Sequence, residues 1–341
     1  IQLQAKYFDT PDRLLAQHGA ALRQRLEGIS WIQTLKAAGK SHLHRFEHNH
    51  NLGELESSPE LDLSIYQAIP EAQQILTQAL GSDAAALKLT FETDIQRTYR
   101  VIQFEDAEIE VCLDVGVVRA SGREQTIHEV EFELKSGSVQ SLLAFSFEWV
   151  KKYQLWLDVR SKAEMGNLLA LEQTVSPARF EKEFVLSKKE SAAHNLSLLI
   201  GQQMQHLLPN IAAISAGVAE QSHIDQAQTA LEHLQLTLAL FKDWNSNISD
   251  KWAMQLAAFK HQFDHLQHLQ HMQSTLGAFL QNPTTTENLA KDILYAQEKL
   301  GNLVKSTQNV HHYLELLTFR SSSHDQVQKQ DLKTYAHNTL Q

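Results

Sequence analysis

Apolar and polar residues alternate with a period of two over most of residues 7–145. The clearest alternation lies in residues 21–25, 32–36, 108–114 and 129–134. This pattern is typical of strands that bury one face. Short helical stretches interrupt it at residues 11–18, which we expect Thr10 to cap, and at residues 70–80. Strands joined by short connections predict an antiparallel sheet or barrel with flanking helices, an α+β arrangement.

After residue 176 the pattern becomes helical. Apolar residues recur at three- and four-residue steps, which predicts an amphipathic face in a helical bundle; an example is the stripe Leu231, Leu234, Leu238 and Phe241. Helical spacing covers residues 196–208, 227–244, 252–280 and 288–317, and residues 282–287 form a break before a helix start. We therefore expect two domains, an α+β domain at residues 1–175 and an all-α bundle at residues 176–341.

Charged side chains occupy one face of several predicted strands, because side chains two positions apart on a strand point the same way. The rows are Arg23 and Arg25; Arg45 and Glu47; Glu108, Glu110 and Asp114; and Glu129, Glu131 and Glu133. Two arrangements fit. The charges lie in water on an exposed sheet, or they line the lumen of a barrel whose apolar exterior is covered by helices.

Rows of like carboxylates repel one another unless cations or metal ions lie opposite. The cationic strands carry Arg23, Arg25, Lys36 and Arg97. A ligand with several negative charges, bound together with Mg²⁺ or Mn²⁺, would reconcile the two kinds of strand, since cations bind phosphoryl oxygens and carboxylates hold the metal.

The composition indicates the cellular compartment and excludes some classes of binding partner. The 341 residues carry a formal net charge of −10, which argues against a nucleic-acid partner, because duplex binding depends on clustered cations. Cys112 is the only cysteine, so a reducing compartment, the cytoplasm, is expected. We expect no membrane association, since no apolar run reaches transmembrane length, and a monomer or homodimer.

Several ordered segments of the first half resemble the CYTH domain, the family of triphosphate tunnel metalloenzymes. They are YFDTPD (7–12), GAALRQR (19–25), TLK (34–36), RFE (45–47), QR (96–97), EVCLDVG (110–116), EVEFEL (129–134) and SK (161–162). The resemblance covers roughly residues 1–170. It implies an eight-stranded antiparallel tunnel that binds triphosphate along its axis.

The resemblance also implies roles for individual residues. Six match positions that hold phosphate oxygens: Arg23, Arg25, Lys36, Arg45, Arg97 and Lys162. Six match acidic positions, some of which hold Mg²⁺ or Mn²⁺: Glu47, Glu110, Asp114, Glu129, Glu131 and Glu133. We expect Glu131, Glu129 and Lys36 to be catalytic. By analogy, water attacks the terminal phosphorus with a carboxylate as base while cations neutralise the leaving diphosphate.

The sequence departs from the family in two places. The family's opening strand, with two alternating glutamates and a lysine, is expected some tens of residues before Tyr7 and is not in the sequence. Those residues supply metal ligands and part of catalysis, so we expect a truncated N-terminus; a true start at Ile1 would imply an inactive barrel. Met165 stands where relatives often carry Arg, which predicts weaker affinity or a changed chain-length preference.

The second half resembles a CHAD domain, a helical family associated with polyphosphate, in its apolar frame only. Residues 224–235 align with that family's helix, but Asp225 replaces the expected histidine, and Gln228, Glu232 and Gln235 replace basic residues. With 13 Lys and Arg against 15 Asp and Glu, we expect a degenerate scaffold. His261, Asp264, His265, His268 and His271 share one helical face, which predicts either a Zn²⁺ or Ni²⁺ site or a solvated face.

These observations predict a metal-dependent enzyme that hydrolyses inorganic triphosphate or short polyphosphate. Alternatives are an adenylate cyclase or thiamine triphosphatase of the same family, or a module that binds polyphosphate or nucleotide without turnover. Trp31 would either stack on an organic head group or serve as a strand-end aromatic residue.

Overall fold

The computed structural model describes residues 1–41, 44–181, 183, 186–242, 246–276, 279 and 283–321. They fall into two compact units, each discontinuous in sequence. The sheet unit comprises Ile1–Gly137 and Arg160–Ser176, and the helical unit comprises Ser138–Val159 and Pro177–Gln341. The division into separately folding domains near residue 175 remains a prediction.

The sheet unit holds seven strands and five helical segments. They are β1 (Gln2–Asp9), α1 (Leu14–Gln17), β2 (Ala20–Glu27), β3 (Ser30–Ser41), β4 (His44–Glu54), the 3-10 helices η1 (Ser64–Tyr66) and η2 (Asp83–Ala86), α2 (Pro70–Leu80), β5 (Lys88–Phe104), β6 (Ala107–Ala120), β7 (Arg123–Ser136) and α4 (Lys162–Ala170).

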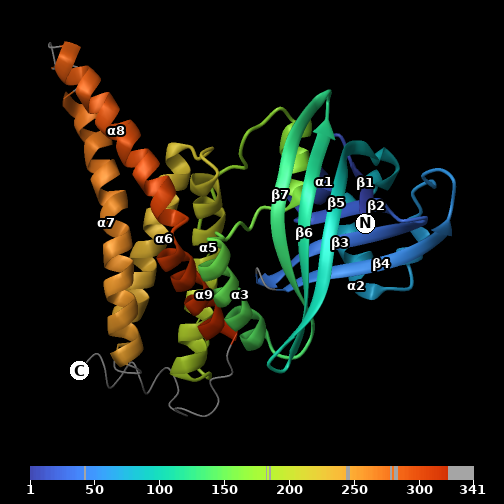
Figure 1. Ribbon diagram of the computed structural model, residues 1–341, viewed down its shortest axis with the longest axis horizontal. Coiled ribbons are helices and arrows are strands. Elements are labelled where there is room, and N and C mark those ends of the chain that lie inside the picture. The colour runs from blue at the N-terminus through green and yellow to red at the C-terminus, as the bar shows by residue number, and fades with distance from the viewer. Residues whose placement is uncertain are drawn as a thin grey trace. The chain divides into compact units, whose positions relative to one another are not determined.

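All neighbouring strands are antiparallel, in the order β4-β3-β2-β1-β5-β6-β7. The sheet curls around a concave face (Figure 1). The predicted α+β class with an antiparallel sheet is therefore confirmed. The described residues hold seven strands, so the expected count of eight is not confirmed.

Strand register places the predicted charges on one face. Directly opposed residues of an antiparallel pair share a face. Arg23 lies opposite Tyr7, and Lys36 lies opposite Glu47. On the other side of β1, Arg97 lies opposite Asp114, which in turn lies opposite Glu129.

The opposite, convex face of β2 and β3 is covered by α1 and α2. Leu22 and Leu35 pack there with Leu15, Ala72 and Leu80. The α1 turn begins at Leu14, three residues later than the expected start at residue 11. Thr10 Oγ1 still accepts a hydrogen bond from Leu14 N at 3.0 Å, and the Asp9 carboxylate accepts from Leu15 N and Ala16 N, at 2.9 and 3.0 Å. Helices thus cover apolar strand positions while the charges face the other way, as in the second of the two predicted arrangements. The described strands form a curled sheet with β4 and β7 at its edges, so the closed barrel stays a prediction.

Two glutamines also lie on this convex face. Gln24 and Gln33 are 0% exposed. Gln24 Nε2 donates to Gln33 Oε1 at 3.1 Å and to Glu60 O at 3.1 Å, and Gln33 Nε2 donates to Asp62 O at 2.6 Å. The segment before η1 therefore satisfies both amides and is fixed against the sheet.

Helix α4 packs on the charged face, at one end of it. Ser161 caps the helix by accepting from Glu164 N at 3.1 Å. Met165 packs with Leu3, Phe91 and Ile127, so this methionine is a core residue. The cap leaves Lys162 as the first residue of the helix.

The described part of the helical unit contains six α-helices. They are α3 (Val139–Tyr153), α5 (Ala192–Ser215), α6 (Gln221–Leu240), α7 (Ser246–Leu276), α8 (Pro283–Val304) and α9 (Thr307–Ser321). The predicted stripe of Leu231, Leu234, Leu238 and Phe241 is at most 4% exposed. Residues 288–317, which have one continuous helical pattern, form α8 and α9 with a break at Lys305-Ser306.

Helix α3 belongs to the helical unit although it precedes residue 176. His311 Nε2 of α9 lies 3.1 Å from Phe147 O of α3, and their rings are in contact. Thr307 Oγ1 also donates to Gln154 Oε1 at 3.2 Å. None of the helices in the described ranges is both long enough and apolar enough to span a membrane.

A close approach between α4 and β5 depends on Gly166. A Cβ at this position would lie 2.2 Å from the Phe91 ring, which stacks on Tyr7 at 4.4 Å.

We expect Gly166→Ala to destabilise the sheet unit by about 1–3 kcal/mol, the usual cost of overpacking. Urea denaturation measures this change, with Gly301→Ala in α8 as the matched helical control, because a Cβ there meets only Ile214 O at 3.7 Å. Equal stabilities of the two variants would contradict the close approach.

A buried histidine makes the helical unit sensitive to pH. Burial lowers the pKa of His312 from 6.5 to about 4, although Glu315, 3.8 Å away, opposes the shift. The unfolded chain binds more protons between these values, so stability should fall by about 2 kcal/mol between about pH 7.5 and about pH 5.

Urea midpoints followed by far-ultraviolet circular dichroism test this expectation. His312→Leu should remove that part of the pH dependence, whereas His265→Gln, at an exposed position of α7, should keep it. The same pH dependence in His312→Leu and the unsubstituted protein would contradict the assignment.

Candidate functional site

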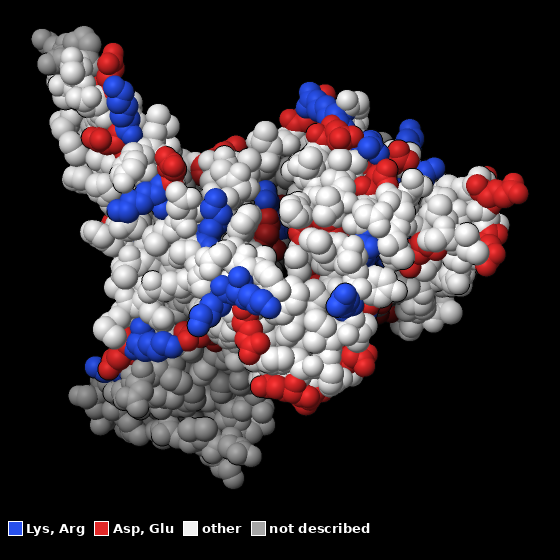
Figure 2. Space-filling model, viewed as in Figure 1, with Lys and Arg blue, Asp and Glu red and all other residues white. Residues whose placement is uncertain are grey.

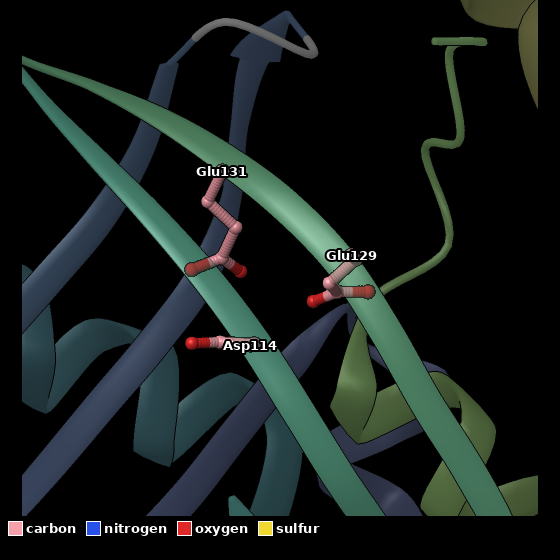
Figure 3. A group of neighbouring side chains, drawn as sticks. All are labelled: Asp114, Glu129 and Glu131. Carbon is pink, nitrogen blue, oxygen red and sulfur yellow. The ribbon is translucent and has the colours of Figure 1, made fainter. Parts of the chain in front are cut away.

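Three carboxylates converge on the concave face of β6 and β7. Asp114, Glu129 and Glu131 each offer an oxygen, and these oxygens lie within 4.8 Å of one another. Figure 3 shows the three side chains turned toward one another. Cα register explains the convergence, since Asp114 lies opposite Glu129 and Cys112 lies opposite Glu131.

Two cations hold these carboxylates together. Arg97 binds Asp114 with two hydrogen bonds, of 2.7 and 2.6 Å, and pairs with Glu131 at 2.5 Å. Lys162 reaches from the start of α4 to all three, at 2.8 Å from Asp114, 2.9 Å from Glu131 and in contact with Glu129. The Asp114 side chain is only 1% exposed, so these pairs form in a largely desolvated position.

The pKa values of Glu129, Glu131 and Lys162 depend on two opposing effects: burial, which disfavours the charged form, and neighbouring opposite charges, which favour it. Burial raises the pKa of Glu131, but Lys162 and Arg97 outweigh it and bring the value to about 2. Burial also raises the pKa of Glu129, and there the shift stays upward. Burial acts against the cationic form of Lys162, yet the carboxylates raise its pKa. Of the two predicted catalytic carboxylates, Glu129 is therefore the stronger base.

A second group of cations lies on β2 and β3. Lys36 Nζ pairs with Glu47 at 2.7 Å, and Arg25 pairs with Glu27. The Arg23 side chain is 9% exposed, and its guanidinium lies at the limit of contact with two side chains: Tyr7 Oη at 3.5 Å and Glu47 at 4.0 Å. No residue in the described ranges accepts a hydrogen bond from Arg23 Nε. This buried guanidinium therefore has hydrogen-bonding capacity left for an anion.

The sheet curvature brings the two groups into electrostatic range. Five inter-strand steps separate β3 from β7, about 24 Å in a flat sheet. Nevertheless the charge of Lys36 contributes to lowering the pKa of Glu131, and Glu131 contributes to raising that of Arg23. Cations and carboxylates from opposite ends of the sheet thus share one region.

Tyr7 was missed by the sequence analysis. Its hydroxyl lies between the two cation groups: burial raises its pKa, but Arg23, Lys36 and Lys162 outweigh burial and lower it. Tyr7 is 6% exposed. The sequence offered two signals: the alternation of residues 3, 5 and 7 puts Tyr7 on the charged face, and Tyr7 begins the motif YFDTPD of the family resemblance.

Other predicted site residues lie outside this region. Glu110 and Glu133 are opposite one another, and both pair with Lys135, at 3.4 and 2.7 Å. Arg45 is exposed and forms no ion pair with any residue that the structure describes. Trp31 is 6% exposed, which agrees with a strand-end aromatic residue packed within the protein rather than one that stacks on an organic head group.

The histidine face of α7 forms no convergent cluster. Within the described ranges, the only group of three potential metal ligands is Asp114, Glu129 and Glu131. Asp264 accepts instead from Lys260 and Gln228, at 2.6 and 2.8 Å.

The donor set fits a hard divalent cation. Carboxylate oxygens suit Mg²⁺, Mn²⁺ and Ca²⁺. On the face of the molecule drawn in Figure 2, basic and acidic side chains are interspersed. The concave face likewise holds both signs of charge: the carboxylates of β6 and β7 pair with Arg97 and Lys162, and the cations of β2 and β3 pair with Glu27 and Glu47. This arrangement can hold a divalent ion beside an anion with several charges.

The sheet unit is a curled antiparallel sheet with cations and carboxylates on its concave face. Residues 1–166 match the model of the CYTH domain family. This part of the chain is therefore a CYTH domain, as the motifs predicted. The CHAD-like assignment of the helical half stays a prediction.

Among curated proteins, the inorganic triphosphatase of Haemophilus influenzae is 34% identical over 191 residues, 55% of this chain. The chain spans about half the length of this relative, 51%.

Two solved structures are also similar. A candidate adenylate cyclase from Bacillus halodurans has 20% identity and a TM-score of 0.33, over 48% of this chain and 81% of that chain. A candidate adenylyl cyclase from Hippeastrum, described as having a dominant triphosphatase activity, has 14% identity and a TM-score of 0.32, over 51% and 83%. At these TM-scores neither likeness carries an argument about this chain.

The site predicts an unequal response to the loss of two arginines. Arg97→Met removes the side chain that donates two hydrogen bonds to the buried carboxylate of Asp114. We expect the free energy of unfolding to fall by about 3 kcal/mol, as for other broken buried ion pairs. Arg119→Met breaks pairs between side chains at least 33% exposed and should cost at most about 1 kcal/mol. Urea denaturation measures both; similar losses would contradict a structural role for Arg97.

Proposed function

We propose that the protein hydrolyses inorganic triphosphate or a short polyphosphate with the help of Mg²⁺ or Mn²⁺. The single observation that carries this proposal is the shared concave face, which holds the buried Arg23, the partly exposed Arg25 and Lys36, and the carboxylates Asp114, Glu129 and Glu131. The CYTH assignment and the triphosphatase relative support it.

Each group has a chemical task in this proposal. Arg23, Arg25 and Lys36 bind phosphoryl oxygens, for which arginine forks and ammonium groups are suited. Asp114, Glu129 and Glu131 would hold the divalent ion, which when bound neutralises phosphoryl charge and lowers the pKa of water. Such catalysis is mainly positioning and charge stabilisation.

Proton transfer in this proposal uses two of the predicted catalytic residues. Glu129, with its raised pKa, accepts the proton of the attacking water. Burial and Arg23 lower the pKa of Lys36, which brings it closer to neutrality and makes it a better donor to the leaving diphosphate. Glu131, with a pKa of about 2, remains ionised, and in the protein without ligands it pairs with Arg97 and Lys162.

Phosphate release by the full-length protein tests the reaction. With Mg²⁺ or Mn²⁺ we expect turnover of inorganic triphosphate to exceed that of ATP and of thiamine triphosphate. Faster turnover of either organic triphosphate would favour the alternative activities. Tight triphosphate binding without phosphate release would favour the binding module.

Glu131→Gln and Arg25→Ala should each lower phosphate release from triphosphate by at least about tenfold, because each removes a charge-stabilising group. Glu124→Gln, which breaks an exposed pair with Arg119, is the matched carboxylate control and should retain activity. Circular dichroism checks that the variants are folded. Retained activity in folded Glu131→Gln and Arg25→Ala would exclude the concave face from the reaction.

A further inference from the structure

The three carboxylates proposed to hold a metal ion already have partners within the protein. Lys162 contacts all three, and Arg97 contacts Asp114 and Glu131. The Lys162 and Arg97 side chains are only 13% and 15% exposed. Two of the six cations predicted to bind phosphoryl oxygens, Arg97 and Lys162, therefore also neutralise the proposed metal ligands.

A divalent cation that binds alone must compete with Lys162 and Arg97 for these oxygens. If it displaces them, two largely buried cations lose their partners, which is unfavourable. If it does not displace them, it lies beside two positive charges. Either way the protein binds the metal weakly in the absence of an anion.

A polyphosphate that binds alone meets the converse difficulty. If Lys162 and Arg97 turn toward phosphoryl oxygens, three carboxylates are left within 4.8 Å of one another with no counter-charge. The anion and the carboxylates then repel one another as well. Simultaneous binding avoids both costs, because the metal replaces the cations at the carboxylates and the anion receives the cations.

The geometry points to an exchange of ion pairs, which we propose as the link between the two ligands. Lys162 and Arg97 pass from Asp114, Glu129 and Glu131 to phosphoryl oxygens when a divalent cation binds these carboxylates. Each ligand then strengthens the binding of the other by the same factor. The inference rests on the proposed function, since the anion is the triphosphate of that site.

An independent observation marks where the anion lies. Arg23 is 8% exposed and its Nε has no acceptor among the described residues, so this guanidinium is not satisfied within the protein. Unlike Lys162 and Arg97, it is available without breaking a short ion pair. It therefore serves as the first contact for the anion before the exchange.

The binding of Mn²⁺ alone gives the first test, measured from the electron paramagnetic resonance signal of the free ion. If Lys162 competes with the metal, Lys162→Gln should bind Mn²⁺ at least about tenfold more tightly than the unsubstituted protein, since one nearby unit charge is removed. Arg119→Gln removes an equal charge from the same sheet and is the matched control, with little change expected. Unchanged or weaker Mn²⁺ binding by Lys162→Gln would overturn the exchange.

The binding of triphosphate in EDTA gives the second test and does not depend on the folding of Lys162→Gln. Glu129→Gln should bind metal-free triphosphate at least about fivefold more tightly, measured by isothermal titration calorimetry, because Lys162 is partly released. Glu124→Gln controls for the general loss of a negative charge. Equal affinities of these two variants would overturn the exchange.

These tests distinguish a failure of the ion-pair exchange from a failure of the proposed hydrolysis. If the unsubstituted protein hydrolyses triphosphate but neither variant binds more tightly, the exchange is wrong and the function stands. If both variants bind more tightly but no phosphate is released, the exchange stands and hydrolysis is wrong.

Discussion

The buried carboxylate of Asp114 and its two cations are the interaction on which the sheet unit depends. Arg97 comes from β5, Asp114 from β6 and Lys162 from α4, so one group of ion pairs joins three elements. Removing Arg97 or Lys162 takes a counter-charge away from the Asp114 carboxylate, whose side chain is 1% exposed. Glu129 and Glu131 extend the group to β7, and ion pairs with the same two cations relieve their repulsion.

The remainder of the sheet unit serves to keep these charges facing inward. Helices α1 and α2 cover the apolar side of β2 and β3, so the charged side is left as the concave face. Ser161 fixes the start of α4, and Gly166 lets that helix approach Phe91, which together set the place of Lys162. Curvature then brings Lys36 and Arg23 within the influence of Glu131.

Alternation predicted the charged face correctly, because Glu129 and Glu131 share a face in any regular strand. It did not predict which carboxylates meet, since that depends on pairing: Glu133 differs from Glu131 by two residues and pairs with Lys135 instead. Gln24 and Gln33 break the apolar pattern because a loop supplies their partners, which no local pattern reveals. Helix α3 shows the same limit, since its sequence does not identify α9 as its neighbour.

The most direct measurement of the central claim is an anomalous difference map from a crystal of the protein soaked with Mn²⁺ and triphosphate. The account predicts a Mn²⁺ peak bounded by Asp114, Glu129 and Glu131, with phosphate density between that peak and Arg23. A Mn²⁺ peak elsewhere, for example on the histidine face of α7, or triphosphate bound away from Arg23, would contradict it.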